Sequence, residues 1–478
     1  MSMLRFDHRK YRAFEPIAKP DRRWPDQRIT QAPSWCSVDL RDGNQALVEP
    51  MNAAQKLRLW ELLISIGFKE IEVGFPSASS HDFAFLRKLI EEDRIPADVT
   101  VQVLTQARPD LITKTFAALA GARRAVVHFY NSTSTVHREY VFGLDRAGIT
   151  EIAVTGAQLV KAAAEAQPET EWVFEYSPES FTGTELDFAV TVCDAVNAVL
   201  SPTPENPVII NLPATVEMST PNIYADQIEW FSDHVRHRDS LILSLHTHND
   251  RGCAVAASEL GLMAGADRVE GTLLGNGERT GNMDILTMAM NLYSQGVDPE
   301  LDFTNMDEIC TVARECTQLP VHPRHPYAGE LVFTAFSGSH QDAIHKCLSK
   351  RDSDSGWDVA YLPIDPADIG RTYQEVIRIN SQSGKGGVAH VLRRDYGLEL
   401  PRWLQVDFST AVQDLAEDSE AEVSSDEIYA LFQQTYLMTA DRWQLGNYQL
   451  LRQNGSDGLE VTLTGPSGDV ALSGQGNG

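Results

Sequence analysis

The stretch LILSLHTHNDRG, residues 241–252, joins an apolar run to two histidines that stand two positions apart, His246 and His248. The run 241–248 is expected to form a buried strand, because it is short, apolar and followed by turn-forming residues. Alternate residues of a strand point to the same face. The stretch therefore predicts a buried strand whose polar end aims two imidazoles at one point.

Segments of the same kind recur along the chain and alternate with amphipathic helical stretches such as 53–67. The expected strands are 34–40, 70–75, 99–105, 125–131, 171–177, 207–213, 241–248 and 266–275. This alternation predicts parallel strands with right-handed crossovers, and eight such units over roughly 250 residues have the size of a closed (β/α)8 TIM barrel. The alternative is an open doubly wound sheet, which usually has a glycine fingerprint after its first strand. DLRDGNQ (39–45) is not such a fingerprint.

The chain changes character on both sides of this region. Residues 1–33 are rich in proline, arginine and lysine, helical patterns dominate from 306 to 440, and GLEVTLTG (458–465) alternates like an exposed strand. The sequence predicts an N-terminal arm (1–33), a TIM-barrel catalytic domain (34–305), helical linker subdomains (306–440) and a C-terminal hairpin that begins a further domain (441–478).

Composition narrows the class of protein. The 478 residues are 42% hydrophobic and 22% charged, which is typical of a globular protein with a large core. Their 40 basic and 67 acidic residues give a formal net charge of −27, which argues against nucleic acid or an anionic membrane as a partner. The six cysteines have no paired spacing, and we find neither a signal peptide nor an apolar run of about 18 residues. A cytoplasmic protein with free thiols is expected.

Ligand-type side chains also stand at the ends of other expected strands, and in a barrel these ends meet at one mouth. The first strand runs into Arg41 and Asp42. Asp42 offers a hard oxygen ligand, and Arg41 a fixed cation suited to a substrate carboxylate or an oxyanion. The eighth runs into GNGERTGN (275–282), where Asn282 offers a further oxygen. Polar residues near the ends of the intervening strands are Glu72, His128, Glu179 and Thr215.

Each of these features alone has a more ordinary explanation. Two histidines at this spacing are more often hydrogen bonded than metal bound, Arg41 and Asp42 could form a structural ion pair, and GNGERTGN could be a plain turn. Their recurrence at the same end of successive strands favours a site. Two histidines and one carboxylate, with room for water, suit a metal that acts as a Lewis acid on a 2-oxo acid.

DLRDGNQ, HTHNDRG (246–252) and GNGERTGN together resemble the DRE-TIM metallolyase superfamily. Longer motifs are similar to the 2-isopropylmalate synthases of the long bacterial and fungal type, in the same order over residues 10–478. They include SVDLRDGNQALVEPM, EIEVGFPSAS, YSPESFTGTEL, NLPATVE and YLPIDPADIGRTYQEVIRINSQSGKGG. The resemblance implies a condensation of acetyl-CoA with 3-methyl-2-oxobutanoate and water. The products are (2S)-2-isopropylmalate and CoA, and this is the committing step of leucine synthesis.

The resemblance also implies a metal and a keto-acid pocket. The residues that would hold the metal are Asp42, His246, His248 and Asn282. Mg²⁺ is the expected ion, Mn²⁺ and Zn²⁺ are alternatives, and K⁺ is a candidate activator. The residues that would contact the keto acid are His128, Thr215, Glu72 and Ser177. Arg41 would stabilise the alkoxide that develops in the reaction.

Removal of a proton from the acetyl methyl group requires a positioned base. The resemblance implies Glu179, together with His340 and Tyr373 from the region after the barrel. In the family these last two reach over from the partner chain, so we expect an intertwined homodimer with shared active sites.

The end of the chain and the choice of substrate leave alternatives open. The long family type carries a C-terminal domain that binds leucine, and this chain stops within VTLTGPSGDVALSGQGNG (461–478), so we expect most of that domain, and leucine inhibition, to be missing. A sister synthase of the citramalate or homocitrate type differs by pocket contacts worth only about 1–3 kcal/mol. A retro-aldol lyase shares the metal site but has no need of the region around His340 and Tyr373. A non-catalytic chain that only pairs with a relative is the remaining alternative.

Overall fold

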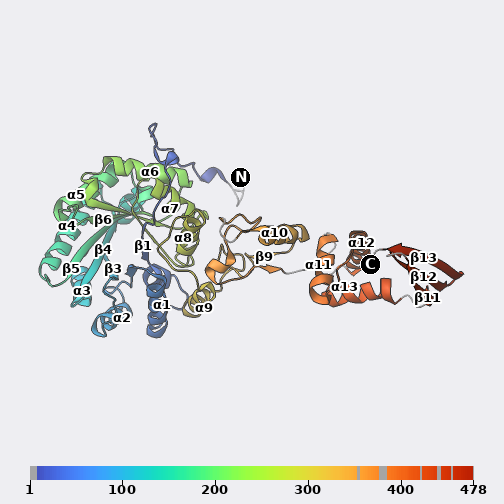
Figure 1. Ribbon diagram of the computed structural model, residues 1–478. Coiled ribbons are helices and arrows are strands. Elements are labelled where there is room, and N and C mark those ends of the chain that lie inside the picture. The colour runs from blue at the N-terminus through green and yellow to red at the C-terminus, as the bar shows by residue number, and fades with distance from the viewer. Residues whose placement is uncertain are drawn as a thin grey trace, which may run out of the picture. The chain divides into compact units, whose positions relative to one another are not determined.

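The computed structural model describes residues 8–352, 356–375, 385–419, 423–438, 443–453 and 456–476. Eight parallel strands close into a barrel in chain order (Figure 1). They are β1 (Ser34–Ser37), β2 (Glu70–Glu72), β3 (Thr100–Gln106), β4 (Arg124–Ser132), β5 (Glu171–Glu179), β6 (Val208–Ala214), β7 (Leu241–Thr247) and β8 (Arg268–Gly271). Because β8 pairs with β1, from Ser34↔Arg268 to Ser37↔Gly271, the predicted TIM barrel is confirmed and the open sheet is excluded.

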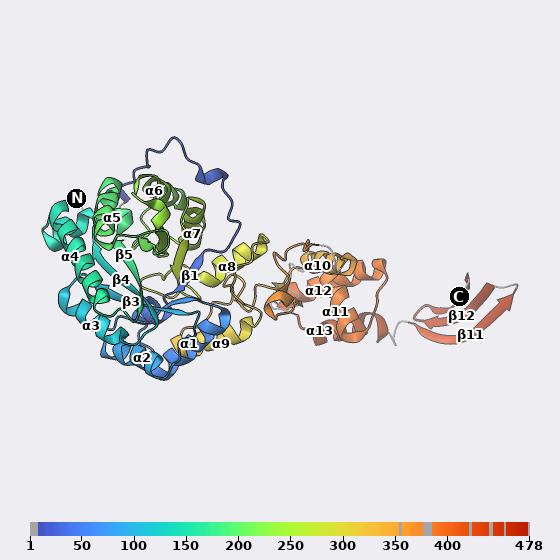
Figure 2. The same cartoon turned by 60° about the vertical axis from the view of Figure 1, so that its left-hand side comes forward.

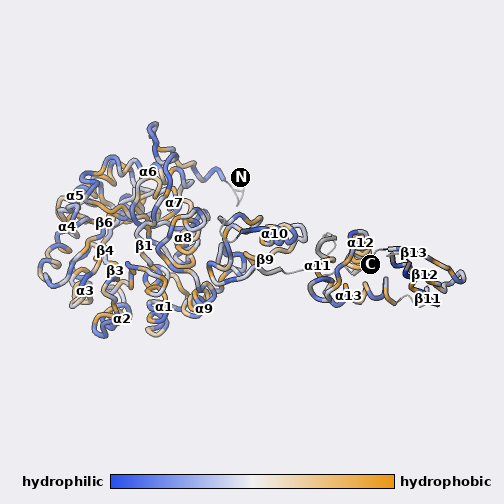
Figure 3. The backbone as a smooth tube through the Cα atoms, in the orientation of Figure 1, coloured by the Kyte–Doolittle hydropathy of each residue, from blue (hydrophilic) through white to orange (hydrophobic). Residues whose placement is uncertain are grey.

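Helices that follow each of the strands cover the barrel, as Figure 2 shows from a second direction. They are α1 (Ala53–Ile66), α2 (Ser80–Glu91), α3 (Pro109–Leu119), α4 (Arg146–Glu165), α5 (Leu186–Leu200), α6 (Pro221–His234), α7 (Ala254–Met263) and α8 (Ile285–Ser294). The helix expected at 53–67 begins with a capping box of Asn52 and Gln55 and ends at Gly67, whose φ of 114° favours glycine. Hydrophobic and hydrophilic residues alternate along these helices (Figure 3), as they do where one helix face packs on a sheet.

The segment before the barrel lies along helix α6 and is bonded to it. Lys19 is buried and its Nζ lies 2.6 Å from Asp233, while Arg22 Nε lies 2.6 Å from Asp226. The backbone N–H of Arg23 donates to Glu229 at 3.0 Å. Asp226, Glu229 and Asp233 all belong to α6, so one helix holds the arm through carboxylates.

The chain packs as two units, Met1–Val332 with Pro366–Arg371, and Phe333–Asp365 with Thr372–Gly478. After the barrel, the first unit also contains α9 (Met306–Thr317). The second contains α10 (Gly338–Lys350), α11 (Lys385–Tyr396), α12 (Arg402–Ser419) and α13 (Ser425–Phe432), and the short parallel strands β9 (Thr334–Ala335) and β10 (Gln374–Glu375). The core of α11–α13 is built on Val391, Leu392, Phe408 and Phe432. The four-part division expected from the sequence stays a prediction.

The expected C-terminal hairpin consists of β12 (Ser456–Gly465) and β13 (Gly468–Gly476), and β11 (Gln444–Gln453) adds a third antiparallel strand. All six cysteines are free thiols. None of the helices in the described ranges is long and apolar enough to span a membrane.

The inside of the barrel is polar where parallel strands are usually apolar. Six side chains there are at most 1% exposed: Gln102, Glu175, Asn211, Ser244, Arg268 and Glu270. Buried charges require partners, and Arg268 donates to Glu270, Gln102 and Ser244 at 2.7–3.0 Å. This layer of hydrogen-bonded residues forms the floor beneath the C-terminal mouth of the barrel.

Candidate metal and keto-acid site

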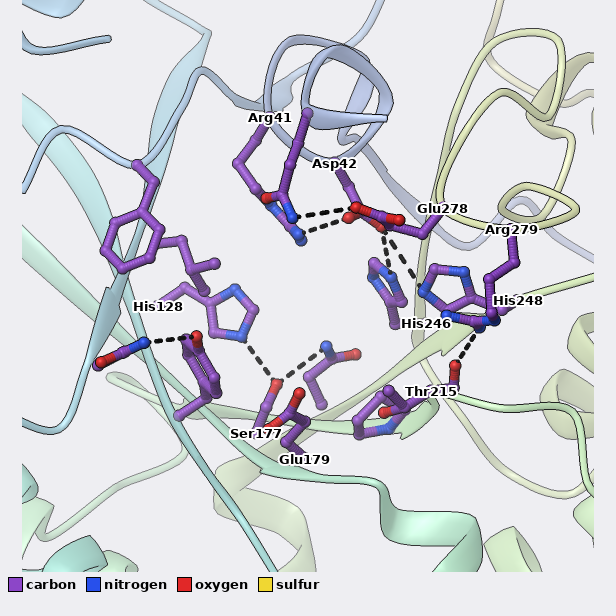
Figure 4. Close-up of a pocket in the computed structure, with 17 residues that line it drawn as sticks. Arg41, Asp42, His128, Ser177, Glu179, Thr215, His246, His248, Glu278 and Arg279 are labelled. Carbon is purple, nitrogen blue, oxygen red and sulfur yellow. Dashed lines mark hydrogen bonds and ion pairs between the residues drawn. The ribbon is translucent and has the colours of Figure 1, made fainter. Parts of the chain in front are cut away.

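A carboxylate and two imidazoles meet at the C-terminal mouth of the barrel (Figure 4). Asp42 lies in the turn Asp39–Gly43 after β1, His246 lies near the end of β7, and His248 follows that strand. His246 Nε2 is 3.2 Å and His248 Nε2 is 3.7 Å from Asp42 Oδ2. One ligand atom from each residue lies within 4.8 Å of those of the other two, and all three side chains are buried. The structure thus brings these three residues together, as the sequence predicted.

Asn282 joins this group from the loop after β8. Its Nδ2 lies 2.7 Å from Asp42 Oδ2 and 3.2 Å from His246 Nε2. Within the described residues, Asn282 Oδ1 and His248 Nδ1 are buried polar atoms without a hydrogen-bond partner. Gly277 makes room for Asn282, since a Cβ there would lie 1.7 Å from its Oδ1. Two imidazoles and a carboxylate fit a divalent cation, and the Asn282 amide would add an oxygen ligand when turned so that Oδ1 rather than Nδ2 faces Asp42.

Burial and charge set the protonation of these groups. Burial raises the pKa of Asp42, but Arg41 and the two histidines outweigh it and hold that pKa well below its usual range. Burial lowers the pKa of His246, yet its hydrogen bonds to Asp42 and Glu270 outweigh it and raise that pKa to about 9. Burial, and then repulsion from His246, lower the pKa of His248 to about 4. At neutral pH the metal-free site therefore carries an extra proton on His246, while His248 is neutral.

Metal binding is expected to release about one proton at pH 7 and to strengthen about tenfold per pH unit up to about pH 9. A metal needs the unprotonated imidazole, and His246 loses its extra proton only as the pH rises through its pKa of about 9. His248, with a pKa of about 4, adds no pH dependence in this range. Calorimetric titration with Mn²⁺ in buffers of different ionisation enthalpy measures the proton count. An affinity that stays constant from pH 6 to pH 8 would contradict the expectation.

The cavity beside this group has a volume of about 490 Å³. Arg41 lies on its wall between two carboxylates, with Nη1 2.9 Å from Asp42 Oδ1 and Nε 2.5 Å from Glu72 Oε2. Burial lowers the pKa of the Arg41 guanidinium, but Asp42 and then Glu72 outweigh it and raise that pKa far above its usual value. The cavity therefore has a permanent, fixed cation beside the candidate metal ligands.

A row of hydrogen bonds continues from Glu72 along the cavity. His128 Nδ1 lies 3.0 Å from Glu72 Oε1, and His128 Nε2 lies 2.7 Å from Ser177 Oγ. Asn211 Nδ2 donates to Ser177 Oγ at 3.1 Å. Apolar lining comes from Phe75, Leu104 and Pro213. This wall offers both polar and apolar contacts to a small substrate.

The rim of the cavity carries two further predicted residues. Glu179 accepts a hydrogen bond from the Ser132 hydroxyl, and the Thr215 hydroxyl accepts one from the backbone N–H of Ser180 at 2.9 Å. Figure 4 shows Ser177 and Glu179 across the cavity from Arg41. Glu179 therefore places a carboxylate opposite the fixed cation.

The last two predicted residues belong to the second unit. His340 lies in α10 and is exposed, and its ring stacks on Tyr361 at 3.9 Å between centroids. Tyr373 precedes β10. Their contribution to the site stays a prediction.

Several lining residues were not foreseen from the sequence: Gln45, Gln106, Tyr130, Asn211, Glu278 and Arg279. Asn211 could have been identified from the sequence, since it is a polar residue inside the apolar run IINLP. Arg279 could also have been identified, because it lies within GNGERTGN, and its guanidinium pairs with Asp250 at 2.6 Å. The others lie beside predicted residues or point inward from strands.

The similarity to known proteins extends over nearly the whole chain. The profile of the family described as HMGL-like matches residues 32–313, and that of the alpha-isopropylmalate synthase post-catalytic domain-like family matches 330–393. The 2-isopropylmalate synthase of Alcanivorax borkumensis is 59% identical over 98% of this chain and 86% of its own length. That of Rhodospirillum rubrum is 63% identical over 90% of this chain and 77% of its own. The HMG-CoA lyase of Brucella melitensis aligns with a TM-score of 0.47 and 18% identity, over 60% of this chain and 98% of that one.

Proposed function

The chain belongs to the 2-isopropylmalate synthases, and on that premise we infer that it condenses acetyl-CoA with 3-methyl-2-oxobutanoate and water to give (2S)-2-isopropylmalate and CoA. This is a transferase reaction of leucine biosynthesis. The observation that carries the assignment is an identity of 59–63% to synthases of that name over 90–98% of the chain. The convergence of Asp42, His246 and His248 at the mouth of the barrel is consistent with it.

A divalent metal bound by Asp42, His246, His248 and Asn282 would polarise the keto-acid carbonyl as a Lewis acid. Mg²⁺ is our first choice, because oxygen ligands and room for water suit it, and Mn²⁺ or Zn²⁺ are the alternatives. Activation by K⁺ stays a prediction.

Arg41 is the group that stabilises negative charge on the keto-acid oxygen. Its guanidinium is held by Asp42 and Glu72 on both sides, so it needs no reorganisation when charge develops. His128 and Ser177 contact the keto acid along the wall, and Leu104 and Pro213 are next to its isopropyl group. Thr215 completes this pocket at the rim.

Glu179, with His340 and Tyr373 of a partner chain, provides the base that takes the acetyl proton. Glu179 is supported by its place on the cavity rim. A homodimer with shared sites is supported by large apolar residues exposed near the mouth, which are typical of interfaces. They are Val136, Tyr140, Val141, Phe142, Val216 and Met218.

Complementation tests the shared site. Asp42→Asn and His340→Ala variants are expected to be inactive separately. When the two are co-expressed, half of the dimers contain both variants and one intact site, so about a quarter of wild-type activity should return. No recovery in verified mixed dimers would place His340 in the site of its own chain.

The assay for the reaction follows CoA release from acetyl-CoA with a thiol reagent. The keto acids to test are 3-methyl-2-oxobutanoate, pyruvate, 2-oxobutanoate and 2-oxoglutarate, each with and without EDTA. We expect turnover chiefly with 3-methyl-2-oxobutanoate, lost with EDTA and restored by Mg²⁺ or Mn²⁺. Turnover with another acid alone would indicate a sister synthase. Absence of turnover with all four would contradict the assignment.

A further inference from the structure

Glu270 lies directly beneath His246 in the floor of the barrel. It is the third residue of β8, is fully buried, and its Oε2 lies 2.8 Å from His246 Nδ1. The other ring nitrogen, Nε2, faces Asp42. A carboxylate on Nδ1 stabilises the tautomer with the proton there, which leaves the Nε2 lone pair free for a ligand. Glu270 thus contacts the nitrogen that faces away from the candidate metal position.

Glu270 is itself fixed by three donors. Its Oε1 accepts hydrogen bonds from Arg268 Nη1 at 3.0 Å and Gln102 Nε2 at 2.9 Å. Its Oε2 also accepts from Asn211 Nδ2 at 3.2 Å. All three donors are at most 1% exposed, so the hydrogen bonds that hold Glu270 are shielded from solvent. The orientation of His246 is therefore fixed by the floor of the barrel.

Glu175 provides a contrast within the same layer. It is equally buried and lies 3.5 Å from Arg268 Nη2 and 3.6 Å from His128 Nε2, and one of its carboxyl oxygens lies within 4.8 Å of one from Glu270. No contact between Glu175 and His246 occurs in the described structure. Arg268 thus lies beside two carboxyl groups, and of these two Glu270 is the one that contacts His246 in the described structure.

We propose that Glu270 is the positioning residue of the metal site, which holds His246 in the tautomer and orientation that metal binding requires. This inference rests on the proposed metal site at Asp42, His246 and His248. Through Asn211, the same carboxylate is also linked to Ser177 and the keto-acid wall. Loss of Glu270 should therefore weaken metal binding even when no substrate is present.

Mn²⁺ binding, measured by electron paramagnetic resonance of the free ion, tests the proposal without turnover. Glu270→Gln keeps the shape, but its amide group cannot accept from His246 and from both Arg268 and Gln102. We expect it to bind Mn²⁺ about 10–100-fold more weakly than the wild type. Glu175→Gln, the matched control, should bind within about twofold of the wild type. Equal affinities for wild type and Glu270→Gln would overturn the proposal, as would an equal loss in both variants.

A second measurement on the wild-type chain keeps the test independent of how Glu270→Gln folds. With ¹⁵N-labelled histidine and bound Zn²⁺, the His246 resonances are identified by their loss in His246→Gln. We expect a proton on Nδ1 and the metal on Nε2, and the reverse assignment would refute the role of Glu270. A wild-type chain that binds neither ion would instead refute the metal site itself.

Discussion

Replacement of Asp42 by asparagine is expected to remove metal binding and to lower kcat/KM by about a thousandfold or more, because the Lewis acid contributes several kcal/mol. Asparagine keeps the shape of the side chain but removes the charge that His246 and His248 share across 3.2 and 3.7 Å. The substitution also removes one of the two carboxylates that pair with Arg41 in the described structure, and Glu72 is the one that stays. Both the metal and the fixed cation should therefore be disturbed together.

Mn²⁺ titration and steady-state kinetics check this expectation. Asp250→Asn is the matched control: Asp250 follows the same strand, is half-buried and pairs with Arg279 at 2.6 Å, but is not a candidate ligand. It should retain kcat/KM within about threefold, since a partly exposed ion pair contributes little. If Asp42→Asn bound Mn²⁺ as tightly as the wild type, the metal would have to be held elsewhere.

The convergence of these side chains at one mouth could be predicted from the sequence because strand period and barrel topology act together. Spacing by two puts His246 and His248 on one face, and parallel closure brings Asp42 and Asn282 to the same mouth. Neither step needs knowledge of side-chain packing. The strand ends were less accurate: the strand expected at 34–40 stops at Ser37, because residues from Asp39 onward turn to place Asp42.

The polar floor could not be predicted in the same way. Arg268 and Glu270 stand in ADRVEGTLLG, where charged residues normally indicate an exposed strand face or a strand end. Glu175, in EWVFEYS, has the same appearance. Only the register of β8 between β7 and β1 makes that face an interior one, and register is a product of the closed barrel. The fixing of His246 from below is thus a property of the fold rather than of a motif.

Replacement of Arg268 by methionine is expected to lower the free energy of unfolding of the metal-free protein by about 3–5 kcal/mol, the usual cost of leaving buried charges unpaired. Arg268 is fully buried, and its guanidinium lies 2.6, 3.0 and 3.5 Å from Glu70, Glu270 and Glu175. Burial raises the pKa of Glu270, but Arg268 and then His246 outweigh it and hold that pKa well below its usual range. Methionine fills most of the space of the arginine side chain, but it removes the positive charge that compensates the buried carboxylate of Glu270.

Urea unfolding of the metal-free variant measures the loss, with Arg124→Met as the control. Arg124 pairs with Glu171 at 3.3 Å on the exposed start of β4, where an ion pair contributes at most about 1 kcal/mol.

The pH dependence gives an independent check on the same variant. Burial raises the pKa of Glu175 well above its usual value even with Arg268 present, so the change falls on Glu270. Without Arg268, Glu270 is a buried carboxyl whose folded pKa is expected to lie above the unfolded value, so its ionisation costs stability at neutral pH and protonation returns it. The deficit of Arg268→Met relative to wild type should therefore shrink as the pH falls from 7 towards 5. A deficit that is constant over this range, or no larger than that of Arg124→Met, would mean that Arg268 stabilises the barrel by packing alone and that the carboxylates of the floor do not depend on its charge.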